Sequence, residues 1–145
     1  MSATALSGLT ATDVSNGWGP IEKNRSNGEA AAGDGRTLSL RGHGFSTGLG
    51  VHSASSMSYA LNGRYSSFRA TVGIDDETGG RGSAVFQLWV DGTLRWTSPV
   101  VTGTSPAVPV VLSVNGAQTL RLTVADGGDG TAYDHADWAD AFLTG

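Results

Sequence analysis

The sequence predicts an all-β fold, an antiparallel β-sandwich of the jelly-roll type. Three observations lead to this fold class. Apolar residues alternate with a period of two through much of the second half of the chain, as they do in strands with one buried face. The 145 residues include 22 glycines, which indicates many tight turns. Helix signals are nearly absent, apart from Glu29–Ala32, which is long enough for a single turn.

The predicted strands are short and are separated by turn residues. We expect them, in chain order, at 37–40, 56–61, 67–74, 84–90, 108–114, 119–124 and 137–143. In the third of these runs every second residue from Phe68 to Ile74 is apolar. In the fourth run the same alternation turns Gln87 and Trp89 to the other face. Each strand therefore has one buried and one wetter face, as in antiparallel sheets.

Three dipeptides mark the connections between these strands. They are Asn62–Gly63, Asp91–Gly92 and Asn115–Gly116. Asparagine, aspartate and glycine tolerate the positive φ angles that two-residue turns require. We therefore expect a tight hairpin at each of the three positions.

The last predicted strand carries an aspartate within an otherwise small and apolar face. Alternation predicts one set toward the core, namely Asp137, Ala139, Ala141 and Leu143, and a second set away from it, namely Trp138, Asp140 and Phe142. This places the Asp137 carboxylate at the buried end of the strand. A buried carboxylate needs hydrogen-bond partners or a cation.

Length and composition limit the possible functions. We expect residues 1–145 to form one domain and to act as a monomer. The net charge of −4 offers no basic face, which argues against nucleic acid as a partner. No apolar run approaches the roughly 20 residues of a membrane span. The absence of cysteine excludes disulfides, thiolate nucleophiles and zinc sites built on sulfur.

Polar residues gather between the predicted strands, and these stretches carry a family resemblance. The chain resembles the NPCBM family, grouped as carbohydrate-binding module family fifty-one, in four stretches that occur in the family's order. They read NGWGPIEKNRSNGEAAAGDGRTLSL, GLGVHSASSMSYAL, FRATVGIDDETGGRGSAVFQLWVDG and DGGDGTAYDHADWADAFL. The resemblance runs from about Leu6 to Leu143 and covers nearly the whole chain.

The resemblance implies a galactose-binding-domain-like jelly roll without catalytic residues. Such modules are usually appended to secreted bacterial glycoside hydrolases, often carry calcium, and bind galactose or galactose-terminated glycans. The implied partners are thus galactose-containing glycans and a covalently linked catalytic domain, outside the cell. One stretch departs from the family pattern: the usual opening is close to SDLPW, whereas Ser7–Ala11 reads SGLTA.

The resemblance and the chemistry of the loops together select candidate ligand-binding residues. A sugar presents hydroxyls and a C–H face, which suit charged groups placed beside an aromatic plate. The candidates are Trp18, Glu22, Arg25, Asn27, His52, Asp75, Asp76, Arg81, Tyr133 and His135. Trp18 would stack on the sugar ring and the polar residues would contact hydroxyls.

Each candidate also has a purely structural interpretation. Trp18 could cap the core, with Glu22 and Arg25 as a surface ion pair of little energetic value. A lone histidine such as His52 is often a satisfied structural residue. The three acids that begin at Asp75 could form a solvated loop, and alternation allows at most two of them to face one pocket.

The acid-rich stretch near the C-terminus is the candidate metal site. Calcium takes six to eight oxygens from carboxylates and carbonyls, and glycine-rich turns expose carbonyls. The candidate ligands are Asp126, Asp129, Asp134 and Asp137. Their spacing matches neither an EF-hand loop nor a calcium-binding β-helix repeat. Tyr133, Asp134 and His135 could instead point into the sugar pocket.

The leading functional hypothesis is a non-catalytic module that tethers a glycoside hydrolase to galactose-bearing glycans. Two alternatives stay open at this point. A structural or interaction domain with a decayed sugar site would agree with the SGLTA departure. A small glycosidase would need two carboxylates roughly 5–10 Å apart, and acids are plentiful, but the chain is short for a deep cleft.

Overall fold

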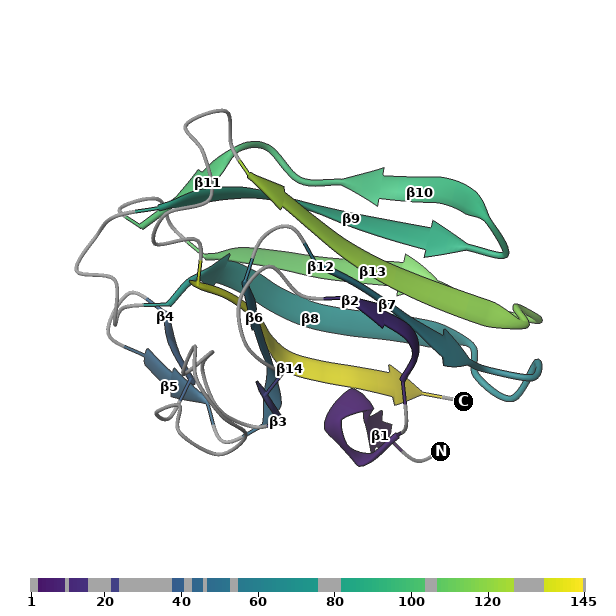
Figure 1. Ribbon diagram of the computed structural model, residues 1–145. Helices are drawn as coiled ribbons and strands as arrows, with labels where there is room; N and C mark the ends of the chain where they lie inside the picture. The colour runs from purple at the N-terminus through teal and green to yellow at the C-terminus, as the bar shows by residue number, and fades with distance from the viewer. Residues whose placement is uncertain are drawn as a thin grey trace.

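The computed structural model describes residues 3–9, 11–15, 22–23, 38–40, 43–45, 47–52, 55–75, 82–103, 107–126 and 135–144. Two antiparallel six-stranded sheets, A and B, face each other as the layers of a sandwich (Figure 1). The predicted all-β sandwich is therefore confirmed. Glu29–Ala32, the predicted helical turn, lies outside the described residues.

Sheet A has the strand order β12-β8-β14-β6-β3, with β1 paired to the far end of β14. Its strands are β1 (Ala3–Ala5), β3 (Glu22–Lys23), β6 (Gly48–His52), β8 (Ser67–Ile74), β12 (Val108–Ser113) and β14 (His135–Thr144). A 3₁₀ turn, η1 (Leu6–Gly8), follows β1. Strand β14 is central, because it pairs with both β6 and β8.

Sheet B has the strand order β10-β9-β13-β7-β2, with β11 paired to the start of β9. Its strands are β2 (Thr12–Ser15), β7 (Ser55–Ala60), β9 (Ser83–Val90), β10 (Thr93–Thr97), β11 (Val101–Thr102) and β13 (Thr119–Asp126). A separate two-stranded hairpin, β4 (Leu38–Leu40) with β5 (His43–Phe45), completes the elements. Strand β4 contacts β14 of sheet A.

Only one of the three predicted hairpins pairs its flanking strands. Asp91–Gly92 joins the paired strands β9 and β10, with φ angles of 50° and 81°. Asn62–Gly63 leads from β7 in sheet B to β8 in sheet A, and Asn115–Gly116 leads from β12 in sheet A to β13 in sheet B. The dipeptides do form turns, but local sequence does not specify which strand will pair with which.

The core lies between the two sheets and is built by the predicted alternation. Every second residue from Phe68 to Ile74 and from Ala84 to Val90 is buried within it. Trp138 lies at its centre and contacts Phe86 edge-on, with ring centroids 5.1 Å apart and an interplanar angle of 88°. Edge-to-face contacts of this kind stabilise a core beyond the burial of area alone.

The predicted faces of the last strand are wrong over half of its length. Trp138 faces the core, whereas Asp137 and Ala139 lie on the opposite, outer face of sheet A. The register shifts between Ala139 and Phe142, where Asp140 has a φ of 51°. This bulge inserts an extra residue, so that beyond it Ala141 and Leu143 face the core as predicted.

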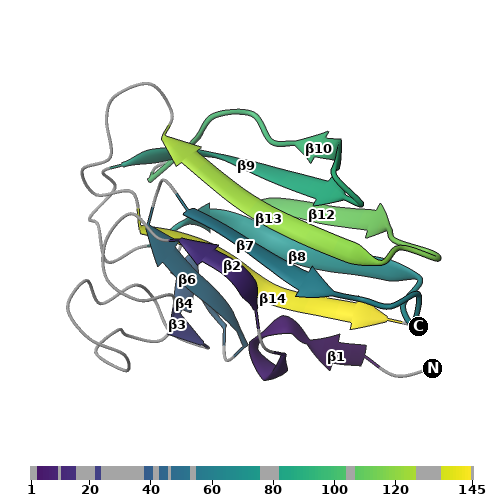
Figure 2. The same cartoon turned by 45° about the vertical axis from the view of Figure 1, so that its right-hand side comes forward.

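The two ends of the described chain lie together, at the end of the sandwich opposite β4 (Figure 2). Ala3 pairs with Thr144 in the register of β1 and β14. The start of β14, the end of β6 and the end of β8 lie side by side, and Ser39 of β4 bonds to Asp75, which follows β8. In the described part of the chain, no helix has the length and apolar character needed to span a membrane.

Candidate functional site

The candidate site lies where three strands of sheet A terminate. Strand β6 ends at His52, β14 begins at His135, and Asp75 directly follows the end of β8. His52 and His135 are register partners, and the backbone N–H of Asp75 donates to the carbonyl of His135 at 2.7 Å. Three predicted ligand residues, distant in sequence, are thereby brought into one row across the sheet.

The two histidines form the centre of this row. Their rings meet edge to face, with centroids 5.2 Å apart and an interplanar angle of 66°. Both are largely buried, at 3% and 6% exposure for His52 and His135. A neutral imidazole offers one hydrogen-bond donor and one acceptor, which is the pair of functions that a sugar hydroxyl also has.

Asp75 is more deeply placed, at 1% exposure. Its Oδ2 accepts a hydrogen bond from the backbone N–H of Ser39 in β4, at 3.1 Å. The carboxylate therefore joins the β4–β5 hairpin to the outer face of sheet A. This contact makes Asp75 a positioning residue for the hairpin as well as a neighbour of the histidines.

The hairpin sits close to the sheet because the sheet carries glycines beneath it. A Cβ added at Gly48 would lie 2.8 Å from Leu38 Cδ1 and 2.5 Å from the Trp138 carbonyl oxygen. A Cβ added at Gly73 would lie 3.0 Å from Leu40 Cδ2. A side chain at Gly48 would force backbone apart, whereas one at Gly73 would require only a small shift of the Leu40 side chain.

Asp137 lies two residues after His135 in β14, so both side chains are on the same outer face of sheet A. Its register partners are Gly50 of β6 and Gly73 of β8, and the backbone of Glu22 in β3 pairs with Gly50 in turn. Asp137 is fully buried, as predicted, but against the outer side of sheet A instead of the sandwich core.

Most of the other predicted site residues lie outside the described residues. These are Trp18, Arg25, Asn27, Asp76, Arg81, Asp129, Tyr133 and Asp134, and for Glu22 and Asp126 the structure describes the backbone alone. The strand ends that adjoin segments 53–54, 76–81 and 127–134 do lie at this end of the sandwich.

The predicted calcium ligands are divided between the two sheets. Asp126 ends β13 in sheet B, where it pairs with Ala84, whereas Asp137 lies on the face of sheet A turned away from sheet B. Within the described residues, no three His, Asp or Glu side chains are arranged to hold a metal ion. The calcium hypothesis therefore depends on residues 127–134.

Sequence reasoning missed the contribution of the β4–β5 hairpin to the site. The contact from Ser39 uses a backbone N–H, which no residue pattern reveals. The glycines had a readable signal: Gly48 and Gly50 alternate along β6, and Leu38 and Leu40 alternate along β4. A glycine within a strand indicates that another segment approaches the sheet closely there, as Leu38 does at Gly48.

Comparisons with known proteins agree with this architecture. The NPCBM/NEW2 domain family matches residues 2–144. The fold superposes with a TM-score of 0.89 on the structure of CBM51 from Clostridium perfringens GH95 in complex with methyl-galactose, at 32% identity over 99% of this chain and 100% of that one. CBM51-2 of Clostridium perfringens ZmpB, solved in complex with GlcNAc, gives a TM-score of 0.88 at 31% identity, over 98% of this chain and 31% of that one.

Curated relatives are much longer than this chain. A proposed endo-alpha-N-acetylgalactosaminidase of Renibacterium salmoninarum is 44% identical over 127 residues, which is 88% of this chain and 8% of that protein. Alpha-1,3-galactosidase B of Akkermansia muciniphila is 34% identical over 107 residues, which is 71% of this chain and 13% of that protein. The chain thus corresponds to a small part of each relative.

Proposed function

Since this chain belongs to the NPCBM/NEW2 domain family and shares the fold of CBM51 modules, we propose that it binds glycans that end in galactose and does not itself cleave them. The observation that carries the proposal is the His52–His135 pair beside Asp75 at one end of the sandwich. These groups are suited to hydrogen bonding with hydroxyls. The similar CBM51 structure was solved with methyl-galactose.

The proposed contacts follow from the chemistry of the row. His52 and His135 bond to sugar hydroxyls, and Asp75 fixes the hairpin that borders them. Seven further candidates would complete the pocket, namely Trp18, Glu22, Arg25, Asn27, Asp76, Arg81 and Tyr133. Trp18 stacks on the C–H face of the ring. The expected dissociation constant for a single sugar is weak, on the order of 1 mM.

We further propose that residues 1–145 act as one module of a longer secreted bacterial protein. Similar modules are parts of enzymes, as in the curated relatives named above. A weak module of this kind works by tethering, because it raises the local concentration of a linked catalytic domain at the glycan surface. The proposed partner is a glycoside hydrolase domain in the same chain.

A structural calcium ion is also part of the proposal, held within residues 126–134. Asp126, Asp129 and Asp134 would supply carboxylates, and the glycine-rich stretch between them would supply carbonyls. Asp137 is a weaker candidate for the same ion because of its position on sheet A. The ion would bind just before His135, with which β14 begins.

The experiment is calorimetric titration of the protein with methyl-galactoside, GlcNAc and methyl-glucoside. Binding of the galactoside at least tenfold tighter than the other two sugars supports the proposal. Preference for GlcNAc would make that sugar the ligand, as for the CBM51-2 module of ZmpB. Release of free galactose from aryl galactosides by the pure protein would contradict the non-catalytic assignment.

A further inference from the structure

A groove of about 530 Å³ crosses the outer face of sheet B, on the opposite side of the sandwich from the histidine pair. Its side chains come from three adjacent strands, β7, β13 and β9. The residues that matter to the argument are Ser58, Gln87, Trp89, Asp91, Arg121 and Thr123. None of them takes part in the function proposed above.

The groove results from the different sizes of side chains in one register row. Trp89 of β9 lies opposite Arg121 of β13, which lies opposite Ser58 of β7. Residues directly opposite each other have Cβ atoms about 5 Å apart, so the indole and the guanidinium begin side by side. The short side chain of Ser58 leaves space above β7, so that Ser58 forms the floor of the groove and Trp89 forms its aromatic wall.

The aromatic wall is held in place by hydrogen bonds. Trp89 Nε1 donates to Thr123 Oγ1 at 3.3 Å, and Thr123 Oγ1 donates to Gln87 Oε1 at 3.3 Å. These two hydrogen bonds fix the indole and direct the amide oxygen of Gln87 toward Thr123. The N–H groups of the Gln87 amide are left as donors. Trp89 remains partly exposed. A fixed, partly exposed indole provides a stacking surface with little entropy to lose on binding.

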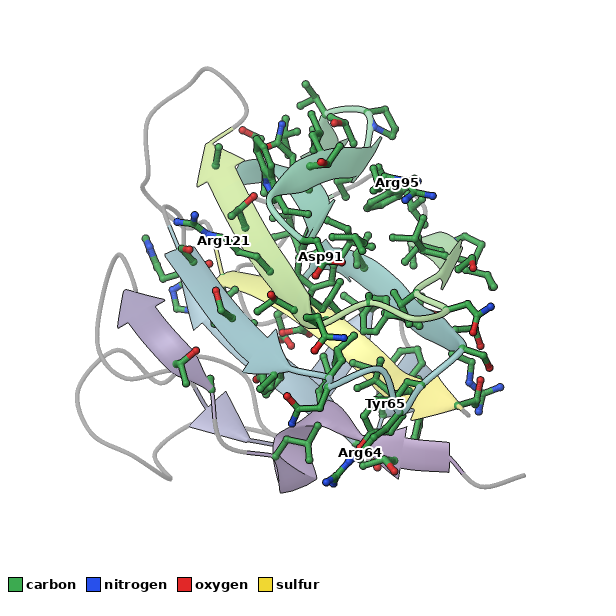
Figure 3. The ribbon with its side chains drawn as sticks, turned by 90° about the vertical axis from the view of Figure 1, so that its right-hand side faces the viewer. Arg64, Tyr65, Asp91, Arg95 and Arg121 are labelled. Carbon is green, nitrogen blue, oxygen red and sulfur yellow. The ribbon has the colours of Figure 1, made fainter. Side chains whose placement is uncertain are left out.

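The charge of the groove is set by Arg121, which is exposed and whose Nε donates to Ser56 Oγ at 2.8 Å. Figure 3 shows Arg121 on the β7 side of β13 and Asp91 on its other side. Asp91 Oδ1 accepts the backbone N–H groups of Gln118 and Thr119, both at 2.9 Å, so its charge is partly compensated. Ser56 is neutral, and among the described residues no carboxylate pairs with Arg121.

We propose that this groove is a second glycan site, which takes an acidic saccharide. The sugar ring stacks on Trp89, and its carboxylate or sulfate bonds to the two terminal nitrogens of Arg121, the fork geometry in which a guanidinium binds such groups. Gln87 and Ser58 contact hydroxyls. The site extends the range of ligands and does not depend on the galactose site.

The test is a titration with methyl-glucuronide and with methyl-glucoside, which carries a hydroxymethyl group in place of the carboxylate. Binding is monitored by Trp fluorescence and by amide chemical shifts in NMR. The variants are Trp89→Ala and Arg121→Gln, with Arg95→Gln as the matched control. Arg95 lies on the exposed strand β10 and does not line the groove (Figure 3). His52→Phe serves as the control for the galactose site.

We expect the glucuronide to bind at least tenfold more tightly than the glucoside, and less tightly as salt is raised. Arg121→Gln and Trp89→Ala should each weaken glucuronide binding at least tenfold and leave methyl-galactoside binding unchanged. Arg95→Gln and His52→Phe should leave glucuronide binding unchanged. Equal binding of the two sugars, or an Arg121→Gln variant with wild-type affinity for the glucuronide, would overturn the proposal whatever the result with galactose.

Discussion

The carboxylate of Asp75 and the backbone N–H of Ser39 are 36 residues apart in sequence and 3.1 Å apart in the structure. This bond joins the end of a central strand of sheet A to a hairpin that belongs to neither sheet. The backbone N–H of Asp75 also donates a hydrogen bond to the carbonyl of His135, at the start of β14. Asp75 thus holds both the β4–β5 hairpin and the start of β14 at His135.

Replacement of Asp75 should test the hydrogen bond between its carboxylate and Ser39. Asp75→Ala removes the part-buried hydrogen bond from the Ser39 N–H and should destabilise the protein by about 1–3 kcal/mol in urea denaturation. Asp75→Asn keeps an acceptor oxygen and should cost less than half as much. Equal losses for the two variants would mean that the negative charge of Asp75, and not the hydrogen bond, provides the stabilisation.

His52→Phe should weaken galactose binding. Phenylalanine keeps the edge-to-face contact with His135 but offers no hydrogen-bonding nitrogen. We expect at least a tenfold loss of affinity for methyl-galactoside by calorimetry. Wild-type affinity in a folded His52→Phe variant would remove His52 from the site.

The two glycines beneath the hairpin should differ in their response to alanine. Gly48 has a φ of 148° and backbone within 2.5 Å of the added Cβ, so Gly48→Ala should cost about 2–4 kcal/mol. Gly73→Ala meets only the flexible end of Leu40 and should cost about 1 kcal/mol, most of it relieved in a Leu40→Ala background. Gly8→Ala, with open space around it, is the control.

Stability should fall at alkaline pH because of Tyr59. Burial raises the pKa of Tyr59 to about 12 from an ordinary value of 10.0, since the charged phenolate is poorly solvated in the core. The folded state therefore holds this proton more tightly, and stability present below pH 10 is lost between pH 10 and 12, by up to about 1.4 kcal/mol per pH unit. Tyr59→Phe should remove this fall, as measured by denaturation across that range.

Met57→Leu is the matching control, because it removes the thioether that accepts the Tyr59 hydroxyl at 3.7 Å and keeps the phenol. The alkaline fall should persist in Met57→Leu. Its persistence in Tyr59→Phe as well would assign the effect to other groups.

Removal of calcium should lower the melting temperature. A ligand at 100 times its dissociation constant stabilises the folded state by about 2.7 kcal/mol, so added calcium should raise the melting temperature and EDTA should reverse the rise. Asp134→Asn should lose most of this response. Asp140→Asn, at an exposed bulge position that asparagine tolerates, should keep it. Identical melting curves in calcium and in EDTA would argue against a metal.

The alternation of apolar residues was sufficient to predict the core strands. Every second residue from Phe68 to Ile74 and from Ala84 to Val90 faces the core, because apolar residues with a period of two lie on one face of a strand. Alternation predicts the wrong face for Trp138 because the bulge at Asp140 depends on a backbone angle, and aspartate at that position gives only a weak signal for it.

Strand pairing and the site depended on contacts that local sequence does not encode. Asn62–Gly63 and Asp91–Gly92 have the same turn chemistry, yet only the second joins paired strands, because the first connects the two layers. The sequence indicates His52, Asp75 and His135 as separate candidates. Their meeting in one row follows from the order of β6, β14 and β8, which is a property of the whole sheet.

The pairing of Ala3 with Thr144 has a mechanical consequence. In any longer polypeptide that is pulled at both of these residues, the force acts at the same end of two antiparallel strands. It would peel β1 from β14 one bond at a time, which requires less force than sliding the strands past each other. His135 lies about 30 Å along β14 from Thr144, where the force is applied. The strand pairing around His52 and His135 would therefore be the last part of β14 to be disrupted.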